Sequence, residues 1–164
     1  MRIKKKAAAQ TPRLEAALAL KARVAMIRAE YNAEITASLE TSCVQTLVKG
    51  GIPLTNIDRF TVPGCFEIPI LAQRLAAQHR YDVLIALGAV IRGDTFHFDL
   101  VANECARGVM EVSLKHDVPI VFEVLAVYRK RDAVRRAGNN RNNKGIEAAG
   151  AALAMLAALH AIEK

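Results

Sequence analysis

The chain has 164 residues, 52% of them hydrophobic and 24% charged, which is enough for one globular core and too few for two. The sequence predicts a cytoplasmic protein, because no apolar run reaches the roughly 20 residues that cross a bilayer and the basic start, residues 1–6, has no secretory signal. The formal net charge of +7 predicts a surface that attracts anions.

The first part of the chain predicts an arm followed by one β-α step. Residues 1–22 are rich in alanine and basic side chains and contain Pro12, which is typical of a flexible, loosely attached segment. A single folded domain is expected to span residues 23–164. It begins with a short apolar strand at 23–28, followed by a polar turn and a helix that Gly50–Gly51 end.

Two further strands are predicted in the middle of the chain. Residues 57–62 predict the second strand, which Pro63–Gly64 end. A helix with one apolar face follows, marked by Ile68, Leu71, Ala72, Leu75 and Ala76. Residues 83–91 are apolar on both alternating faces, as expected for a central parallel strand that helices cover above and below.

The rest of the chain completes the alternation of strands and helices. After a turn at 92–95, a helix carries on one side Val101, Cys105, Val109 and Val112. Residues 118–127 predict the fourth strand, and 132–138 and 143–162 predict helices. Four β-α units without a repeat predict an α/β three-layer sandwich, with a four-stranded parallel flavodoxin-like sheet and helices on both faces.

In such sheets, ligands bind beyond the carboxyl ends of the strands. The turns at 29–32, 62–67, 91–97 and near residue 128 are therefore the places to look for chemistry. The turn at 91–97 combines a glycine, a hydroxyl group and a helix start, which together can cradle a phosphate. Thr95 in this turn fits an ordinary helix cap equally well.

Four histidines are candidates for acid-base chemistry. His97 lies in the first turn of the helix after the phosphate turn, where an imidazole can transfer protons near neutral pH. A partly buried capping histidine is the structural alternative for this residue. The others are predicted to be surface residues, because they fall at polar helix ends or near the tail: His79, His116 and His160.

Other residues near strand ends allow two interpretations each. Glu67 can interact with a helix N-terminus or with a hydroxylated ligand. Tyr31 and Phe122 can stack on a planar heterocycle or close the core. Arg136 and Lys144 stand in a basic, Asn-rich hinge between two helices, and a guanidinium group suits phosphate binding.

The remaining basic residues and the cysteines exclude some classes of site. Arg129–Arg131 place positive charge at a predicted helix start, where the helix dipole disfavours it. The two clusters of basic residues, at 1–6 and 129–144, are not interleaved with aromatic residues, which argues against nucleic-acid binding. Cys43, Cys65 and Cys105 are odd in number and widely spaced, which predicts reduced packing thiols and no metal site.

Three segments resemble, in order and spacing, the signatures of the lumazine synthase family. They are VPGCFEIP at 62–69, GAVIRGDTFHFD at 88–99, and the RAG and NKG motifs within 136–147. The resemblance spans roughly residues 23–158. It implies an enzyme of riboflavin biosynthesis that condenses 5-amino-6-ribitylaminouracil with 3,4-dihydroxy-2-butanone 4-phosphate. The products are 6,7-dimethyl-8-ribityllumazine, phosphate and water, and no metal or organic cofactor takes part.

The resemblance also implies roles for the matching residues. His97 would transfer protons and Glu147 would assist it. The phosphate would be bound by Gly93, Asp94, Thr95 and Arg136. The pyrimidine and its ribityl group would contact Tyr31, Asn32, Cys65, Phe66, Glu67, Ala89, Val90 and Ile91. Phe122 and Lys144 match positions that the adjacent subunit supplies in a homopentamer, which in some members assembles further into a sixty-subunit icosahedral shell.

Some residues depart from the family pattern. Tyr31 stands where phenylalanine or tryptophan is usual, and residues 123–131 replace a Gly-Val-Leu-Thr type sequence with a polar helix start. Activity should survive the change at Tyr31. The altered segment 123–131, the Ala-rich C-terminal helix and the unusual leader point to an alternative, a natural or engineered scaffold that keeps the ring and binds a second protein through its outer surface. The related archaeal riboflavin synthase fold is a further alternative, although Thr95 and Arg136 would have no purpose there.

Overall fold

The most apolar strand of the chain lies inside the sheet, as its composition predicts. In the computed structural model, which describes residues 13–162, β3 (Val83–Ile91) pairs with β1 (Val24–Ala29) on one side and with β4 (Ile120–Val127) on the other. β2 (Ile57–Val62) pairs with β1, so the parallel order is β2-β1-β3-β4. All of β3 except its last residue is buried, because helices cover both faces of the sheet.

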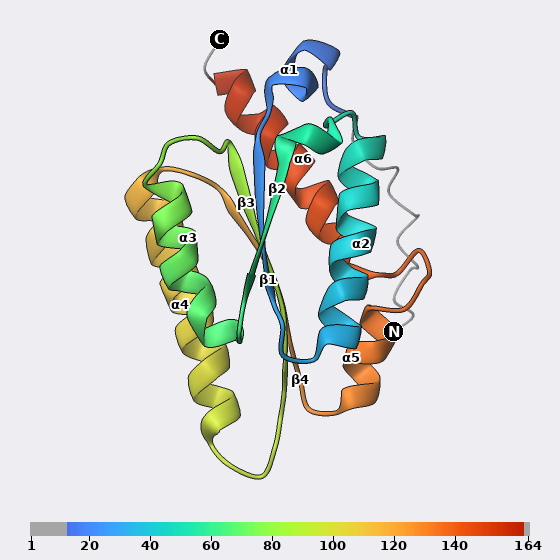
Figure 1. Ribbon diagram of the computed structural model, residues 1–164, viewed down its shortest axis with the longest axis vertical. Coiled ribbons are helices and arrows are strands. Elements are labelled where there is room, and N and C mark those ends of the chain that lie inside the picture. Colours follow the sequence, from blue (N-terminus) through green and yellow to red (C-terminus); the bar gives the residue numbers. More distant parts are fainter. Residues whose placement is uncertain (1–12, 163–164) are drawn as a thin grey trace, which may run out of the picture.

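The helices form two outer layers around this sheet (Figure 1). One layer contains α3 (Ile68–Ala76) and α4 (His97–His116), and the opposite layer contains α2 (Ala33–Lys49), α5 (Lys130–Arg136) and α6 (Lys144–Ile162). Two short 3-10 helices, η1 (Leu54–Asn56) and η2 (Cys65–Glu67), precede β2 and α3. The expected three-layer sandwich with a flavodoxin-like parallel sheet is therefore confirmed.

Each face of the sheet has its own hydrophobic core, because successive side chains of a strand point to opposite faces. Met26 of β1 packs in the core under α2 and α6, together with Leu39 and Leu153. The next residue, Ile27, packs in the core under α3 and α4, together with Ile68. These side chains are fully buried, so both layers are fixed to the sheet by close packing.

The chain before β1 packs partly against the core. Residues 1–12 of the expected arm lie outside the described part of the chain. In the remainder, a short helix, α1 (Ala16–Lys21), precedes β1. Leu14, Ala19 and Ala22 are buried in the core under α2 and α6. The backbone N–H of Leu14 donates a hydrogen bond to the carbonyl oxygen of Gly50 at 3.2 Å, which ties this segment to the end of α2.

Helix α6 corrects the expectation that no segment is apolar enough to cross a membrane. By length and composition alone, its 19 residues could do so. Its inner face is buried against α2 and the sheet at Ala149, Ala152 and Leu153. Apolar helices of this composition also occur in the hydrophobic cores of folded domains.

Gly145, at the start of α6, allows that helix to approach α2 closely. A Cβ atom added there would lie 2.0 Å from the carbonyl oxygen of Leu39 in α2, too close for any side chain. We expect Gly145→Ala to lower the free energy of unfolding by about 2 kcal/mol, because α6 must move away from α2. Denaturant titration at a fixed chain concentration measures this loss.

Gly93→Ala is the matched control for this prediction. An added Cβ at Gly93 meets nothing within 4 Å, so the same chemical change should leave the midpoint of denaturation close to that of the parent chain. Equal midpoints for the Gly145 and Gly93 variants would show that the contact between α2 and α6 does not limit stability.

Candidate active site

A cavity of about 560 Å³ opens at the carboxyl ends of the strands, where the topology predicts a ligand site. Its walls come from the turns after β1, β2 and β3 and from the start of α4. It is lined by Tyr31, Gly64, Cys65, Phe66, Glu67, Ala89, Val90, Ile91, Gly93, Thr95, His97, Phe98 and Val101. Most of the residues assigned to the pyrimidine, the ribityl group and the phosphate therefore lie around one cavity.

The turn after β1 brings an aromatic ring to the edge of this cavity. Tyr31 is 74% exposed, and its backbone N–H donates to the carbonyl oxygen of Pro63 at 3.1 Å. Asn32 adopts the left-handed conformation, with a φ of 60°, which asparagine tolerates better than most residues. Its side-chain amide donates to the carbonyl oxygen of Ala89 at 2.9 Å. Asn32 thereby ties the turn to β3, although it does not itself line the cavity.

Glu67 and Cys65 form the wall next to the turn after β2. The carboxylate of Glu67 accepts a hydrogen bond from the backbone N–H of Gly64 at 2.8 Å, so it shapes this turn as well as facing the cavity. Cys65 packs against Gly88, where an added Cβ would lie 2.5 Å from the sulfur atom. Burial raises the pKa of the Cys65 thiol to about 11, partly offset by a backbone hydrogen bond to Ala89.

The other two cysteines are also free and buried, which confirms their interpretation as packing residues. Burial raises the pKa of Cys105 to about 12, with smaller contributions from Cys65 and Glu67. Burial likewise raises the pKa of Cys43 far above its ordinary value. All three thiols are therefore protonated at neutral pH.

The turn between β3 and α4 presents His97 to the cavity. His97 is the first residue of α4 and is exposed, so it is not the partly buried histidine of the structural alternative. The N-cap of α4 is Phe96 and no side chain caps the helix, so Thr95 does not act as its cap. Gly93 and Thr95 line the same cavity, while Asp94 is exposed beside them. The imidazole of His97 and the candidate phosphate turn with Gly93 and Thr95 thus lie side by side at this cavity.

The remaining predicted site residues do not line this cavity. Arg136 ends α5, and its guanidinium donates to the carbonyl oxygen of Asp132 at 3.0 Å. Lys144 and Glu147 form an ion pair in the first turn of α6. These helices belong to the layer opposite α4 (Figure 1). Phe122 lies on the edge strand β4 and is 39% exposed. One chain therefore carries two separate groups of candidate residues.

Comparison with known proteins shows the family to which this chain belongs. A family model described as 6,7-dimethyl-8-ribityllumazine synthase matches residues 21–160. Proteins with that name from two strains of Stenotrophomonas maltophilia are each 47% identical over 135 residues, which cover 82% of this chain and 87% of theirs. The chain belongs to the lumazine synthase family.

The segment that matches the lumazine synthase family contains all the residues that line the cavity. It also contains the second group, from Phe122 on β4 to Glu147 on α6. The sequence pattern did not separate Arg136 and Glu147 from the cavity residues, because residue order does not tell on which side of the sheet a helix packs. Only the fold reveals this separation.

Glu123, the first residue of the segment that departs from the family pattern, was assigned no site role from the sequence and lies beside the second group. Burial raises the pKa of this carboxyl group to about 7; Lys144 lowers it and Glu147 raises it further. The unfolded chain has the ordinary value of 4.5, so between these pH values the folded state binds more protons. Stability should therefore fall as the pH rises from 4.5 to 7, and then level off.

We expect Glu123→Gln to remove this part of the pH dependence. At pH 7 the variant should be more stable than the parent chain by about 1–2 kcal/mol, a figure that allows for solvent screening of a partly exposed group. Thermal or urea denaturation between pH 4.5 and 8 measures the difference. Glu111→Gln, at an exposed position on α4, is the control. A constant difference between parent and Glu123→Gln across this range would contradict the assignment.

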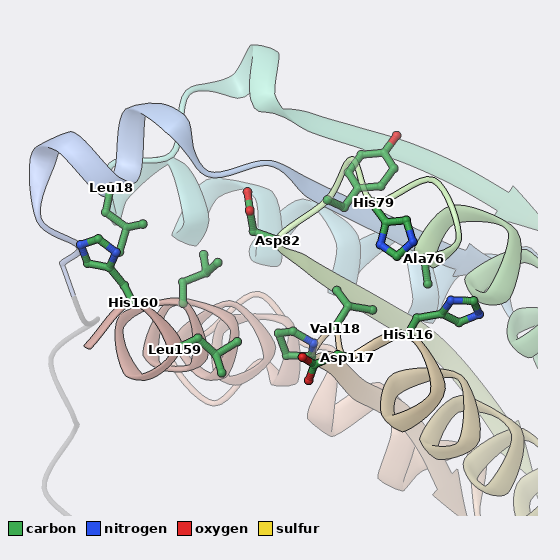
Figure 2. A pocket seen from close by; sticks show the side chains of 12 residues that line it. Leu18, Ala76, His79, Asp82, His116, Asp117, Val118, Leu159 and His160 are labelled. Atoms are coloured by element: carbon green, nitrogen blue, oxygen red, sulfur yellow. The ribbon is translucent and has the colours of Figure 1, made fainter. Parts of the chain in front are cut away.

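A second, smaller cavity of about 220 Å³ lies at the amino ends of the strands (Figure 2). His160 and Leu18 lie at one end of it, and His79 and His116 at the other. The sequence predicts that these histidines are surface residues, and the fold places all three around one open hollow. Within residues 13–162, no group of three or more histidine, cysteine or acidic side chains is arranged to hold a metal ion.

Proposed function

We propose that this chain is a 6,7-dimethyl-8-ribityllumazine synthase that acts in riboflavin biosynthesis. Its substrates are 5-amino-6-ribitylaminouracil and 3,4-dihydroxy-2-butanone 4-phosphate. The family assignment supports this activity, and the relatives with that name match most of the chain. The observation that carries the proposal is the cavity at the carboxyl ends of the strands, which joins an exposed aromatic ring, a candidate phosphate turn and His97.

The cavity residues suit the two substrates. The ring of Tyr31 offers a face on which a planar pyrimidine can stack. Ala89, Val90 and Ile91 border the place for the ribityl chain, and Asn32 ties the turn after β1 to Ala89. Gly93, Asp94 and Thr95 form the turn at the start of α4, where an anion is favoured. This arrangement would place the ketone of the phosphate substrate beside the amine of the pyrimidine.

In the reaction, the amine attacks the ketone carbon and water leaves to give an imine. A proton then leaves the carbon next to the imine as the phosphate group leaves the following carbon, and the resulting enol becomes a ketone. The second nitrogen attacks this ketone and closes the new ring with loss of water. These steps move protons on or off nitrogen, oxygen and carbon. His97 borders both the phosphate turn and the cavity, so its imidazole is placed to accept and return these protons.

We assign the second group of residues to the cavity of a neighbouring copy. Arg136 and Glu147 lie in the layer opposite His97, and Phe122 lies on an edge strand, where another subunit can pack. Arg136 would bind the phosphate from across the interface, while Phe122 and Lys144 would complete the walls and Glu147 would assist His97. A closed ring of identical subunits repeats such a head-to-tail contact.

The proposed ring is a homopentamer, which can assemble further into a shell. A cytoplasmic location of the protein stays a prediction.

The first experiment is an assay of lumazine formation with both substrates, together with the particle mass from light scattering on the same sample. Product formed by a particle of at least five subunits would support the shared site. A ring that makes no product would contradict the proposed activity and favour the scaffold alternative. An active monomer would contradict the assignment of the second group to a neighbouring copy.

A further inference from the structure

One aromatic ring contacts both ends of the turn that carries the candidate phosphate site. The turn Gly93–His97 is preceded by Arg92 and followed by Phe98. The guanidinium carbon of Arg92 lies over the ring of Tyr128, 5.2 Å from its centre. The ring of Phe98 lies on Tyr128 as well, with 6.1 Å between the ring centres. Tyr128 itself follows β4 and belongs to neither end of the turn.

The turn has few other interactions to fix its shape. Across residues 13–162, no hydrogen bond or ion pair is found for the side chains of Asp94, Thr95 or His97, and no side chain caps α4. The backbone N–H of Arg92 donates to the carbonyl oxygen of Val127 at 2.9 Å, which fixes the start of the turn to β4. Because an added Cβ at Gly93 meets nothing within 4 Å, packing does not hold the tip either.

We propose that Tyr128 is a positioning residue for the phosphate turn, acting through Arg92 and Phe98. This inference rests on the proposed function, because it concerns the site for the phosphate substrate. The ring holds the two ends of the turn at a fixed separation, so that Gly93, Asp94 and Thr95 are already in place when phosphate arrives. Ordering a turn before binding increases affinity, because less conformational entropy is lost on binding.

The same contact places a positive charge beside the turn. Stacking on Tyr128 restricts the long side chain of Arg92 at the start of the phosphate turn, where its charge attracts an anion. The neighbouring Lys130 is held elsewhere, since its ammonium group pairs with Glu34 at 2.8 Å. Of the unusual residues at the end of β4 and beyond, Tyr128 thus has a role inside the subunit under this proposal.

The test compares Tyr128→Ala with Tyr128→Phe, which keeps the ring and removes only the hydroxyl group. For Tyr128→Ala we expect the KM for the phosphate substrate to rise about tenfold, the combined effect of losing an aromatic pair and an exposed cation–π contact. The KM for the pyrimidine should stay within about twofold of the parent value. Tyr128→Phe should match the parent chain in both values. Tyr128 is 69% exposed, so the melting temperature should change little in either variant.

A binding measurement separates this proposal from the activity itself. The affinity for inorganic phosphate, measured by calorimetry on the assembled protein, should fall about tenfold in Tyr128→Ala and stay unchanged in Tyr128→Phe. This result would support the positioning role even if the parent chain made no lumazine, an outcome that would overturn only the proposed function. The positioning role would be overturned if parent and Tyr128→Ala bound phosphate equally well, or if the parent bound no phosphate. It would also be overturned by an equal rise of both KM values, or by a loss of phosphate affinity in Tyr128→Phe as large as that in Tyr128→Ala.

Discussion

Replacing His97 with alanine should lower kcat by about 10²–10⁴-fold, the usual contribution of a general acid-base residue. The side chain is exposed at the start of α4 and borders the cavity, so it contributes little to packing. The variant should therefore keep the particle mass and melting temperature of the parent chain. Steady-state kinetics with both substrates, together with light scattering on the same sample, tests both parts of this prediction.

His79→Ala is the matched control, because His79 lies at the amino-end cavity, at the opposite end of the sheet from His97. It should leave kcat unchanged. If His97→Ala retained the parent kcat, or if it lost activity only through loss of assembly, proton transfer would have to be assigned to another group.

Arg136→Ala should raise the KM for the phosphate substrate by about 100-fold, because a guanidinium group binds phosphate through paired, charge-assisted hydrogen bonds. The KM for the pyrimidine should change far less. Arg135→Ala is the control: Arg135 is the neighbouring residue on α5, is exposed, and pairs with Asp132 at 3.2 Å. Steady-state kinetics that vary each substrate in turn measure the effect. A similar rise for both substrates would argue against a phosphate role for Arg136.

Mixed assemblies can show whether Arg136 serves its own cavity or that of a neighbour. In particles formed by co-expressing equal amounts of His97→Ala and Arg136→Ala chains, about one quarter of the sites should combine an intact His97 with an intact Arg136 from the next copy. Activity would then recover to about that fraction of the parent value. No recovery would mean that both residues act within one subunit.

The sheet could be predicted from sequence because burial leaves a direct pattern. Residues 83–91 are apolar on both faces, and this segment is the central strand β3. The residues that follow strands meet at one edge of a parallel sheet, which is why Tyr31, Glu67 and His97 could be placed around one cavity before their geometry was known. Local pattern and topology predicted where the residues of this half of the candidate site lie, while the roles proposed for them came from the family resemblance.

The other half depends on contacts between segments that are distant in sequence. Arg136 ends α5 and Glu147 lies in the first turn of α6, and the hinge between these two helices is held by Asn143. The side chain of Asn143 is buried and donates to the carbonyl oxygens of Ala137 and Gly138 at 2.9 and 3.1 Å. In an Asn-rich segment no local signal distinguishes this asparagine from its exposed neighbours. Tyr128 likewise contacts Arg92 and Phe98, which lie 36 and 30 residues earlier in the chain, and only tertiary structure brings these segments together.

The buried thiol of Cys65 at the cavity wall affects how well the protein resists chemical modification. Because burial raises the pKa of this thiol to about 11, Cys65 is protonated at pH 7, and the thiolate is the form that attacks electrophiles. Adduct formation between Cys65 and a ketone bound in the cavity should therefore be slow. The same protonation slows attack by oxidants and alkylating reagents, so the catalyst should keep working in aerated solution without an added reductant.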